Sequence, residues 1–221
     1  MCILGGMNRK ERSAEQRVRW VYAAQSAAES RDRYDEWAGR YEQDLLDTYG
    51  YRLPSTIAEH FLRWVSPPAT VLDAGVGTGL VGECLAERGF TDLVGLDNSP
   101  AMLEEAARKG LYRSLHEMTL GEPLAFESGA FDAVISAGTF TKGHAPASGL
   151  VELARVTRAG GRVVVGIRRD IVDSHGFAGI IDELESAGVW EFEDRSDAFV
   201  AMEKLESDVL VETWCFRVRR G

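Results

Sequence analysis

Hydrophobic residues recur at helical spacing through the first third of the chain. Ser13 and Gln16 form a capping box just before an apolar stripe, which predicts a helix that begins at Ser13. A further helix is predicted from Pro54, and the prolines at positions 67 and 68 end it because proline cannot continue a helix. Residues 1–68 are therefore predicted to form a helical extension.

One helix of this extension carries an aromatic stripe. It is predicted to follow Ser30 or Asp32, where Tyr34, Trp37 and Tyr41 stand at positions three and seven residues apart. This spacing puts three rings on one face of the helix. Such stripes more often pack in a core than bind a ligand, and the two tyrosines are the better ligand candidates because each has a polar hydroxyl.

From residue 70 onward, short apolar runs alternate with segments of helical spacing. The apolar runs predict strands at residues 70–74, 92–97, 111–118, 131–137, 161–167, 190–193 and 209–218. Capping residues mark helices between most of them, as at Ser99, Pro100 and Gly110. This order predicts an α/β fold with a doubly wound, mostly parallel, seven-stranded sheet. The last two strands have no helix between them and are expected to pair antiparallel.

The composition is that of an ordinary globular protein. The chain has 221 residues, 45% of them hydrophobic and 27% charged, and no run approaches the roughly 18 uninterrupted apolar residues of a membrane span. The net charge of −10 repels phosphate backbones and anionic lipid surfaces, so neither nucleic acid nor a membrane is predicted as a partner. Cys2, Cys84 and Cys215 are too few and too widely spaced for a disulfide framework or a metal site. Without a secretory signal, the predicted location is cytoplasmic.

The motif that carries chemistry is a glycine-rich turn after the first predicted strand. Gly75, Gly77 and Gly79 alternate with other residues, and glycine lets a backbone bend sharply and approach a ligand closely. Asp73 precedes the turn, and Asp97 ends the next strand, where a carboxylate can accept both hydroxyls of a ribose. In an open α/β sheet, ligands bind beyond the carboxyl ends of the strands at this point. The spacing D-x-G-x-G-x-G differs from the G-x-G-x-x-G of dinucleotide folds.

Four segments stand in the order and spacing of a known set of motifs: VLDAGVGTGL, LVGLDNSPAMLEEA, EPLAFESGAFDAVIS and ELARVTRAGGRVVV. On these segments the chain resembles the class I S-adenosylmethionine-dependent methyltransferases, over about residues 32–218. At finer grain, YDEWAGRYEQDL, TLGEPL and GTFTKGHAP are similar to the methyltransferase-like protein family of the Williams-Beuren critical region and its bacterial relatives. The resemblance implies a Rossmann-like sheet and the cofactor S-adenosylmethionine. It also implies one structural unit made of a lid over residues 1–68 and a cofactor-binding domain over residues 69–221.

The resemblance assigns contacts to the cofactor position by position. Gly75 and Gly77 would face its methionyl part, and Asp73 would hold its ammonium group directly or through water. Asp97 would accept its ribose hydroxyls. The aromatic stripe matches a helix that closes over the cofactor in related enzymes.

The adenine would lie beside Asn98 and Met102. Thr119 and Leu120 occupy the place where many members of the family have an acidic residue, so the adenine contact would rest on backbone or on the Thr119 hydroxyl. The predicted cofactor-binding residues are Tyr34, Tyr41, Asp73, Gly75, Gly77, Asp97, Asn98, Met102, Thr119, Leu120 and Ser136.

A general base is predicted at His144, in the polar loop of residues 141–144 after the fourth strand. An exposed imidazole there titrates near pH 6.5 and can take a proton from an acceptor. No N-P-P-[YF] motif follows the fourth strand and no Pro-Cys pair is present, which disfavours amino methylation of adenine or glutamine and carbon methylation of cytosine. The other histidines, at positions 60, 116 and 175, have no supporting group of residues.

The predicted function is methyl transfer from S-adenosylmethionine to a small-molecule acceptor. The sulfonium methyl is already activated, so the protein mainly needs to hold cofactor and acceptor in line. About 50 residues follow the fifth strand, which leaves no large insert for recognition of a macromolecule. Two alternatives stay open. One is a cofactor-binding protein that regulates a partner without catalysis. The other is a nicotinamide-dependent oxidoreductase, which the glycine spacing and the absence of a Tyr-x-x-x-Lys pair weigh against.

Overall fold

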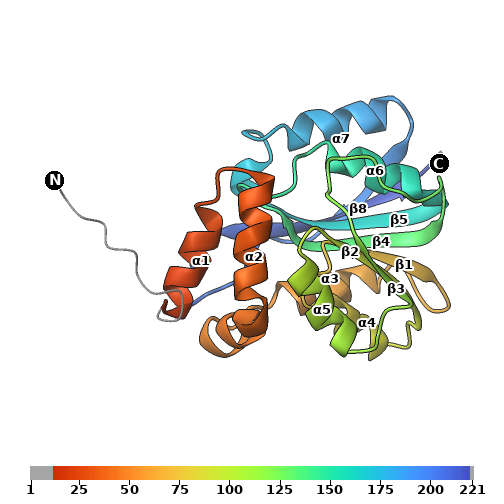
Figure 1. Ribbon diagram of the computed structural model, residues 1–221. Helices are drawn as coiled ribbons and strands as arrows, with labels where there is room; N and C mark the ends of the chain where they lie inside the picture. Colours follow the sequence, from red (N-terminus) through yellow and green to blue (C-terminus); the bar gives the residue numbers. More distant parts are fainter. Residues whose placement is uncertain (1–11, 220–221) are drawn as a thin grey trace.

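Helices cover both faces of one mixed sheet in the computed structural model, which describes residues 12–219 (Figure 1). The first eleven residues, with Cys2 and the two candidate start methionines Met1 and Met7, lie outside the described residues. The helices are α1 (Ala14–Tyr22), α2 (Ala27–Glu42), the π-helical turn η1 (Gln43–Thr48), α3 (Leu53–Phe61), α4 (Leu80–Ala86), α5 (Pro100–Arg108), α6 (Gly149–Val156), the short η2 (Arg169–Ile171) and α7 (Phe177–Ser186). The strands are β1 (Thr70–Ala74), β2 (Asp92–Asp97), β3 (Ser114–Glu117), β4 (Phe131–Phe140), β5 (Thr157–Arg168), β6 (Trp190–Arg195), β7 (Phe199–Val200) and β8 (Leu210–Val218).

The strands run in the order β3-β2-β1-β4-β5-β8-β6, and the two-residue β7 also pairs with β8. Strands β1 to β5 pair in parallel, whereas β8 is antiparallel to β5, β6 and β7. This arrangement confirms the doubly wound, mostly parallel fold with an antiparallel last strand. The short β7 makes the sheet eight-stranded, and the sequence did not predict it because two residues carry no period.

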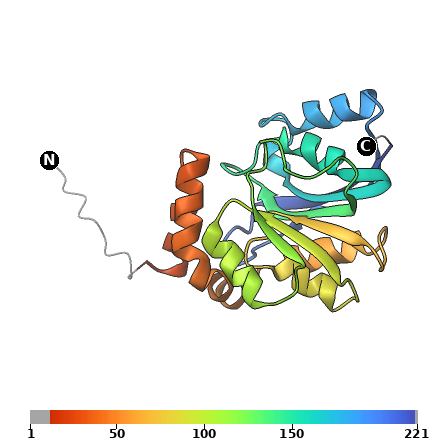
Figure 2. The ribbon, with the colours of Figure 1, turned by 45° about the vertical axis from the view of Figure 1, so that its right-hand side comes forward.

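The central strands are apolar because both of their faces are covered. In β1, Leu72 and Ala74 belong to the cluster under α6 and α7, and Val71 belongs to the opposite cluster under α3 and α4. Figure 2 shows α6 and α7 on one side of the sheet and α3, α4 and α5 on the other. Covered in this way, the sheet holds the carboxyl ends of β1, β2 and β4 in fixed positions.

Helices α1 and α2 stand against one end of the sheet and have a core of their own (Figure 1). Asp44 is buried there, accepts two hydrogen bonds from the guanidinium of Arg17 and a third from the indole of Trp37. The Arg17 guanidinium and the Trp37 indole hold the pKa of the Asp44 carboxyl below its usual range, although burial opposes them. These contacts bind α1 to α2 and to η1.

Two helix boundaries differ from the sequence-based expectation. Helix α2 begins at Ala27 rather than after Ser30 or Asp32, because the Ser26 hydroxyl accepts a hydrogen bond from the Glu29 amide and caps the helix. Helix α3 ends at Phe61, before the proline pair. No helix within residues 12–219 is long and apolar enough to cross a membrane.

Candidate active site

The glycine-rich turn joins β1 to α4 and is tied to the neighbouring strand. The amides of Gly75 and Val76 both donate to the carbonyl of Leu96, each at 2.8 Å. Gly75 has φ +81°, and a Cβ added there would lie 2.1 Å from Oγ1 of Thr139 on β4. Only glycine fits this position, since any other residue would meet both the left-handed backbone and the Thr139 side chain.

Asp97 closes the turn from the carboxyl end of β2. Its Oδ2 accepts a hydrogen bond from the Gly77 amide at 2.9 Å, and its Oδ1 accepts one from the Ser99 amide at 3.0 Å. Burial raises the pKa of the Asp97 carboxyl, and the amide donors oppose that shift. The carboxylate is thus held at the strand end where ligands of such sheets bind.

A cavity opens between this turn, α2 and the segment after β4, and we call it the cofactor cavity. Its wall consists of Ala27, Ser30, Tyr34, Tyr41, Gly75, Gly77, Leu96, Asp97, Asn98, Met102, Met118, Thr119, Leu120, Ala137, Gly138, Thr139, Gly143, His144, Ala145 and Pro146. Ten residues predicted from the sequence as cofactor contacts or as the base are brought together in this wall: Tyr34, Tyr41, Gly75, Gly77, Asp97, Asn98, Met102, Thr119, Leu120 and His144.

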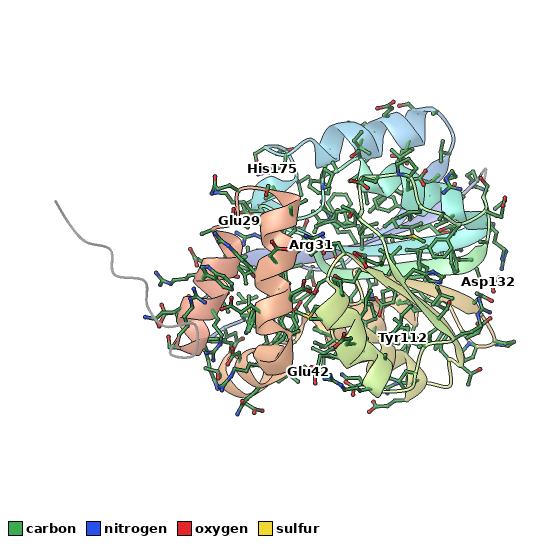
Figure 3. All side chains as sticks on the ribbon, viewed as in Figure 1. Glu29, Arg31, Glu42, Tyr112, Asp132 and His175 are labelled. Atoms are coloured by element: carbon green, nitrogen blue, oxygen red, sulfur yellow. The ribbon has the colours of Figure 1, made fainter. Side chains whose placement is uncertain are left out.

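Two predicted cofactor residues, Asp73 and Ser136, are buried outside this wall. The Ser136 hydroxyl donates to the carbonyl of Ala74 at 2.6 Å and so ties β4 to the start of the glycine turn. Asp73 accepts a hydrogen bond at 2.7 Å from the hydroxyl of Tyr112, which lies on the side of the sheet covered by α4 and α5 (Figure 3). Burial raises the pKa of Asp73 to about 7.

The aromatic stripe of α2 has one ring outside the wall of the cofactor cavity and two rings within that wall. Trp37 is buried and donates its indole N–H to Asp44, so it packs in the core of the extension. Tyr34 and Tyr41 instead line the cofactor cavity. The helix is fixed over the sheet by Asp35, whose Oδ1 accepts from the Ser99 hydroxyl at 2.6 Å and from the Ala101 amide at 3.1 Å.

Glu42, near the end of α2, adds a second anchor to α5 (Figure 3). Its Oε1 lies 2.6 Å from Nζ of Lys109, the residue that follows the last turn of α5. Asp35 in the middle of α2 and Glu42 at its end therefore hold the second half of α2 against the two ends of α5.

A second cavity adjoins the cofactor cavity, and we call it the aromatic cavity. Its wall consists of Tyr22, Tyr34, Trp37, Tyr41, Leu45, Tyr51, Leu53, Gly138, Phe140, Thr141, Gly166, Arg168, Ala201, Met202, Glu206, Val209 and Val211. Tyr34, Tyr41 and Gly138 belong to both walls, so the two cavities meet at these three residues. The sequence indicated only the tyrosines of the stripe, because the other walls come from segments far apart along the chain.

His144 is half-buried rather than exposed, and its hydrogen bonds define its tautomer. Nδ1 lies 3.1 Å from the carbonyl oxygen of Lys142, which can only accept, so Nδ1 carries the proton. Nε2 is then the acceptor for the Tyr34 hydroxyl, at 2.7 Å. Burial lowers the pKa of His144, and the positive charge of Arg168 lowers it further. The imidazole is therefore a neutral base, and the lone pair on its Nε2 accepts the hydrogen bond from Tyr34.

Comparison with known proteins identifies the class of enzyme. A methyltransferase domain family matches residues 72–165, which span the glycine turn, Asp97 and His144. Methyltransferase-like protein 27 of Homo sapiens is 38% identical over 182 residues, which cover 79% of this chain and 74% of the human protein. The chain belongs to this methyltransferase family. It is an S-adenosylmethionine-dependent methyltransferase, and solved structures of such enzymes share its Rossmann-like fold. The oxidoreductase alternative is thereby set aside.

The prediction that excluded nucleic acid as a partner is wrong. The 18S rRNA (guanine-N(7))-methyltransferase of Bos taurus is 44% identical over 69 residues, which are 31% of this chain and 24% of that protein. A methyltransferase of Haloferax volcanii, solved in complex with the Trm112 methyltransferase activator, matches with a TM-score of 0.61 and 19% identity over 85% of this chain and 98% of that chain. Net charge sums the whole surface, whereas such partners contact one face, so the sum does not exclude them.

Two features at the glycine turn suit S-adenosylmethionine, one in the cavity wall and one behind it. A Cβ added at Gly77, which has φ +52°, would meet no atom within 4 Å, so the backbone of the turn leaves open space in the cavity wall. Oδ1 of Asp73 is buried and has no hydrogen-bond partner in the described part of the chain. A buried carboxylate oxygen without a donor is costly, and the ammonium group of this cofactor is the kind of donor that it lacks.

Proposed function

We propose that this enzyme methylates a compact small molecule held in the aromatic cavity, with the reacting atom at the opening formed by Tyr34, Tyr41 and Gly138. The observation that carries the proposal is the sharing of these three residues by both cavity walls. A methyl donor in one cavity and an acceptor in the other would face each other across this opening. Transfer requires such an in-line arrangement at about 3 to 3.5 Å.

Within the cofactor cavity, Asp97 would accept the ribose hydroxyls, and Asn98 and Met102 would lie beside the adenine. Leu120 and Thr119 also line this cavity, and the Thr119 hydroxyl would accept a hydrogen bond from the adenine amine. Gly75 and Gly77 would face the methionyl part, with Asp73 behind them as the partner of its ammonium. Ser136 supports the turn through Ala74. The cofactor supplies a methyl group on a positively charged sulfur, which keeps the electron pair of the carbon–sulfur bond.

Tyr34 and His144 would carry the proton of the acceptor. The acceptor atom forms its new bond to carbon with its lone pair, and its proton passes to the hydroxyl oxygen of Tyr34. The proton already on that hydroxyl moves to Nε2 of His144 along the existing 2.7 Å hydrogen bond. Because the pKa of His144 is lowered, the imidazole is neutral and able to receive this proton at pH 7.

The extension would act as the lid of this site, with residues 1–68 as one part and residues 69–221 as the catalytic part of the same structural unit. Helix α2 contributes Ala27, Ser30, Tyr34 and Tyr41 to the cofactor cavity, so the acceptor and cofactor are enclosed only when α2 is seated. Its contacts with α5 are polar, and polar contacts can open without exposing a large apolar face.

The test is methyl incorporation from radiolabelled S-adenosylmethionine into a cell extract that is divided by size after the unreacted donor has been removed by chromatography. We expect label in the small-molecule fraction with the parent enzyme and none with a Gly77→Val variant that cannot hold the cofactor. Label found only in RNA or protein would overturn the proposal, and so would label that is equal for both enzymes.

A further inference from the structure

The aromatic cavity has one polar end, where Arg168 and Glu206 lie. Arg168, the last residue of β5, donates from Nε to Oδ1 of Asp170 at 3.0 Å and from Nη2 to Oδ2 of the same residue at 2.8 Å. This fork-to-carboxylate pairing uses the Nε and Nη2 edge of the guanidinium and leaves Nη1 on the side of Glu206. The guanidinium is therefore already committed to a carboxylate of its own chain.

Glu206, the other charged group of this end, has one long ion pair and, within residues 12–219, no hydrogen bond to its carboxylate. Its side chain is 20% exposed, and its nearest cationic contact is Nη1 of Arg168, with 3.7 Å between nitrogen and Oε1. Burial raises its pKa, the positive charge of Arg168 opposes that shift, and the carboxylates of Asp208 and Asp170 add to it.

The charges at this end do not balance. Asp170 and Glu206 together carry two negative charges when ionised, and Arg168 carries one positive charge. The negative charge of Glu206 reaches the cavity rings, because it raises the pKa of Tyr22, Tyr34 and Tyr51. Asp170 lies outside the cavity wall, so a ligand that contributes one positive charge beside Glu206 would neutralise this group of three side chains.

The walls next to Glu206 also suit a cation. Six aromatic residues line the cavity: Tyr22, Tyr34, Trp37, Tyr41, Tyr51 and Phe140. The hydroxyls of Tyr22, Tyr41 and Tyr51 make no hydrogen bond to any group of the described chain, so they can turn their oxygen lone pairs toward a ligand. Ring faces attract ammonium and guanidinium groups, most strongly where water is excluded.

We propose that the methyl acceptor carries a cationic nitrogen that lies against Glu206 and the tyrosine rings, while a separate nucleophilic atom reaches the opening at Tyr34. This inference rests on the proposed function and names the class of its acceptor, an amine-bearing small molecule. Glu206 holds the acceptor in position and takes no part in the transfer of the methyl group. A neutral acceptor would leave the excess carboxylate without a partner.

The first test measures binding to the whole protein by titration calorimetry with three probes of equal shape. The probes are 2-phenylethylammonium, 2-phenylethanol and phenylacetate. We expect the ammonium probe to bind at least about tenfold more tightly than the alcohol, and phenylacetate to bind most weakly. Equal affinities for the ammonium probe and the alcohol, or a preference for phenylacetate, would overturn the proposal.

A pair of variants assigns this preference to one side chain. Glu206→Gln keeps the size of the side chain and should bring the ammonium probe to within threefold of the alcohol. Glu203→Gln changes an exposed glutamate of the same loop that does not line the cavity, and it should keep the full preference. A preference that survives Glu206→Gln, or that Glu203→Gln also removes, contradicts the role of Glu206.

The second test separates failure of this inference from failure of the proposed function. Labelled small-molecule products of the extract assay are first separated from unreacted S-adenosylmethionine, which is itself a cation, and are then passed over a cation exchanger at pH 7. Label retained on the exchanger, and reduced at least tenfold with Glu206→Gln, supports the amine acceptor. Label in the flow-through keeps the small-molecule function and overturns the amine. Label only in macromolecules overturns both.

Discussion

The two cavities of this enzyme are built in different ways. The walls of the cofactor cavity come largely from the residues between Gly75 and Pro146, where backbone hydrogen bonds tie the glycine turn to β2. The aromatic cavity is assembled from α1, α2, the segment after η1, the ends of β4 and β5, and the residues that lead into β8. The cofactor cavity thus draws mostly on one stretch of the chain, whereas the aromatic cavity, where we propose that the acceptor binds, depends on segments that only the folded chain brings together.

The largest expected effect tests the cofactor side. Gly77→Val should weaken S-adenosylmethionine binding by more than roughly 1000-fold, about 4 kcal/mol, because the side chain would fill the open space of the turn. Calorimetric titration measures this, and circular dichroism checks that helix content is kept. Gly50→Val is the matched control, since Gly50 also has a positive φ and open space but lines neither cavity. Equal loss in both variants would mean that backbone strain, rather than the cavity, is responsible.

The next prediction concerns His144, which contacts Tyr34 at the junction of the two cavities. His144→Gln should lower the methylation rate by roughly 100-fold and leave cofactor affinity unchanged, because glutamine can accept from Tyr34 but cannot take up a proton. His175→Gln, at an exposed histidine outside both cavities, should keep the parental rate. A His144→Gln enzyme with more than half the rate would assign this side chain to loop structure.

The next prediction concerns Asp97, at the carboxyl end of β2. Asp97→Ala should weaken cofactor binding by about 2 kcal/mol, or roughly 30-fold, since it removes the acceptor for two ribose hydroxyls. Asp92→Ala changes the carboxylate at the other end of β2, where it pairs with Arg113, and should leave affinity within threefold. An Asp97→Ala affinity near that of the parent would remove Asp97 from the ribose site.

The contact of Asp35 on α2 with the start of α5 predicts a smaller effect, on hydrogen exchange. Asp35→Ala removes the acceptor for the Ser99 hydroxyl and the Ala101 amide, so amides of α2 should exchange hydrogen about tenfold faster, about 1.4 kcal/mol. Exchange in β1 and β2 should not change. Asp32→Ala, an exposed neighbour on the same helix that pairs only with Arg31, serves as the control. Unchanged exchange in α2 would show that its apolar contacts alone hold it.

The smallest effect is a shift with pH. His144 has a lowered pKa in the folded protein, so it stays neutral below pH 6.5, where an unfolded chain is already protonated. The unfolded state therefore binds more protons in this range, and the contribution of His144 to stability is lost as pH falls from 6.5 toward the folded-state pKa. Denaturant unfolding at several pH values should show a smaller loss for His144→Gln than for the parent. An identical pH dependence would contradict the lowered pKa.

Local sequence signals were enough to predict the strands in the parallel half of the sheet and the helices beside them. Ser99 and Pro100 mark the start of α5 and the run TVLDA marks β1, because caps and buried strands depend on neighbours in sequence. The extent of the lid was harder. The sequence alone predicted that α2 follows Ser30 or Asp32, whereas the hydrogen bond from the Glu29 amide to the Ser26 hydroxyl places its start at Ala27.

Contacts between distant residues left no sequence signal. Tyr34 and His144 are 110 positions apart, and no period or motif links them. Glu206 and Arg168 lie in a loop and at a strand end, where isolated charges are usually solvated. His60, which had no supporting residues in the sequence, is buried between Thr213 and Asp194 and bonds both. Each of these side chains gains its role from packing, which the order of residues does not encode locally.

The position of β8 has a consequence for how the protein is made. This strand is synthesised after β5 and β6 but lies between them in the sheet. Until residue 218 has emerged from the ribosome, β5 presents an unpaired edge, and β6 has no strand to join. The glycine turn and Asp97 can assemble earlier, because β1, β2 and β4 are already complete. The nascent chain can therefore form its cofactor cavity before its aromatic cavity, which needs Val209 and Val211.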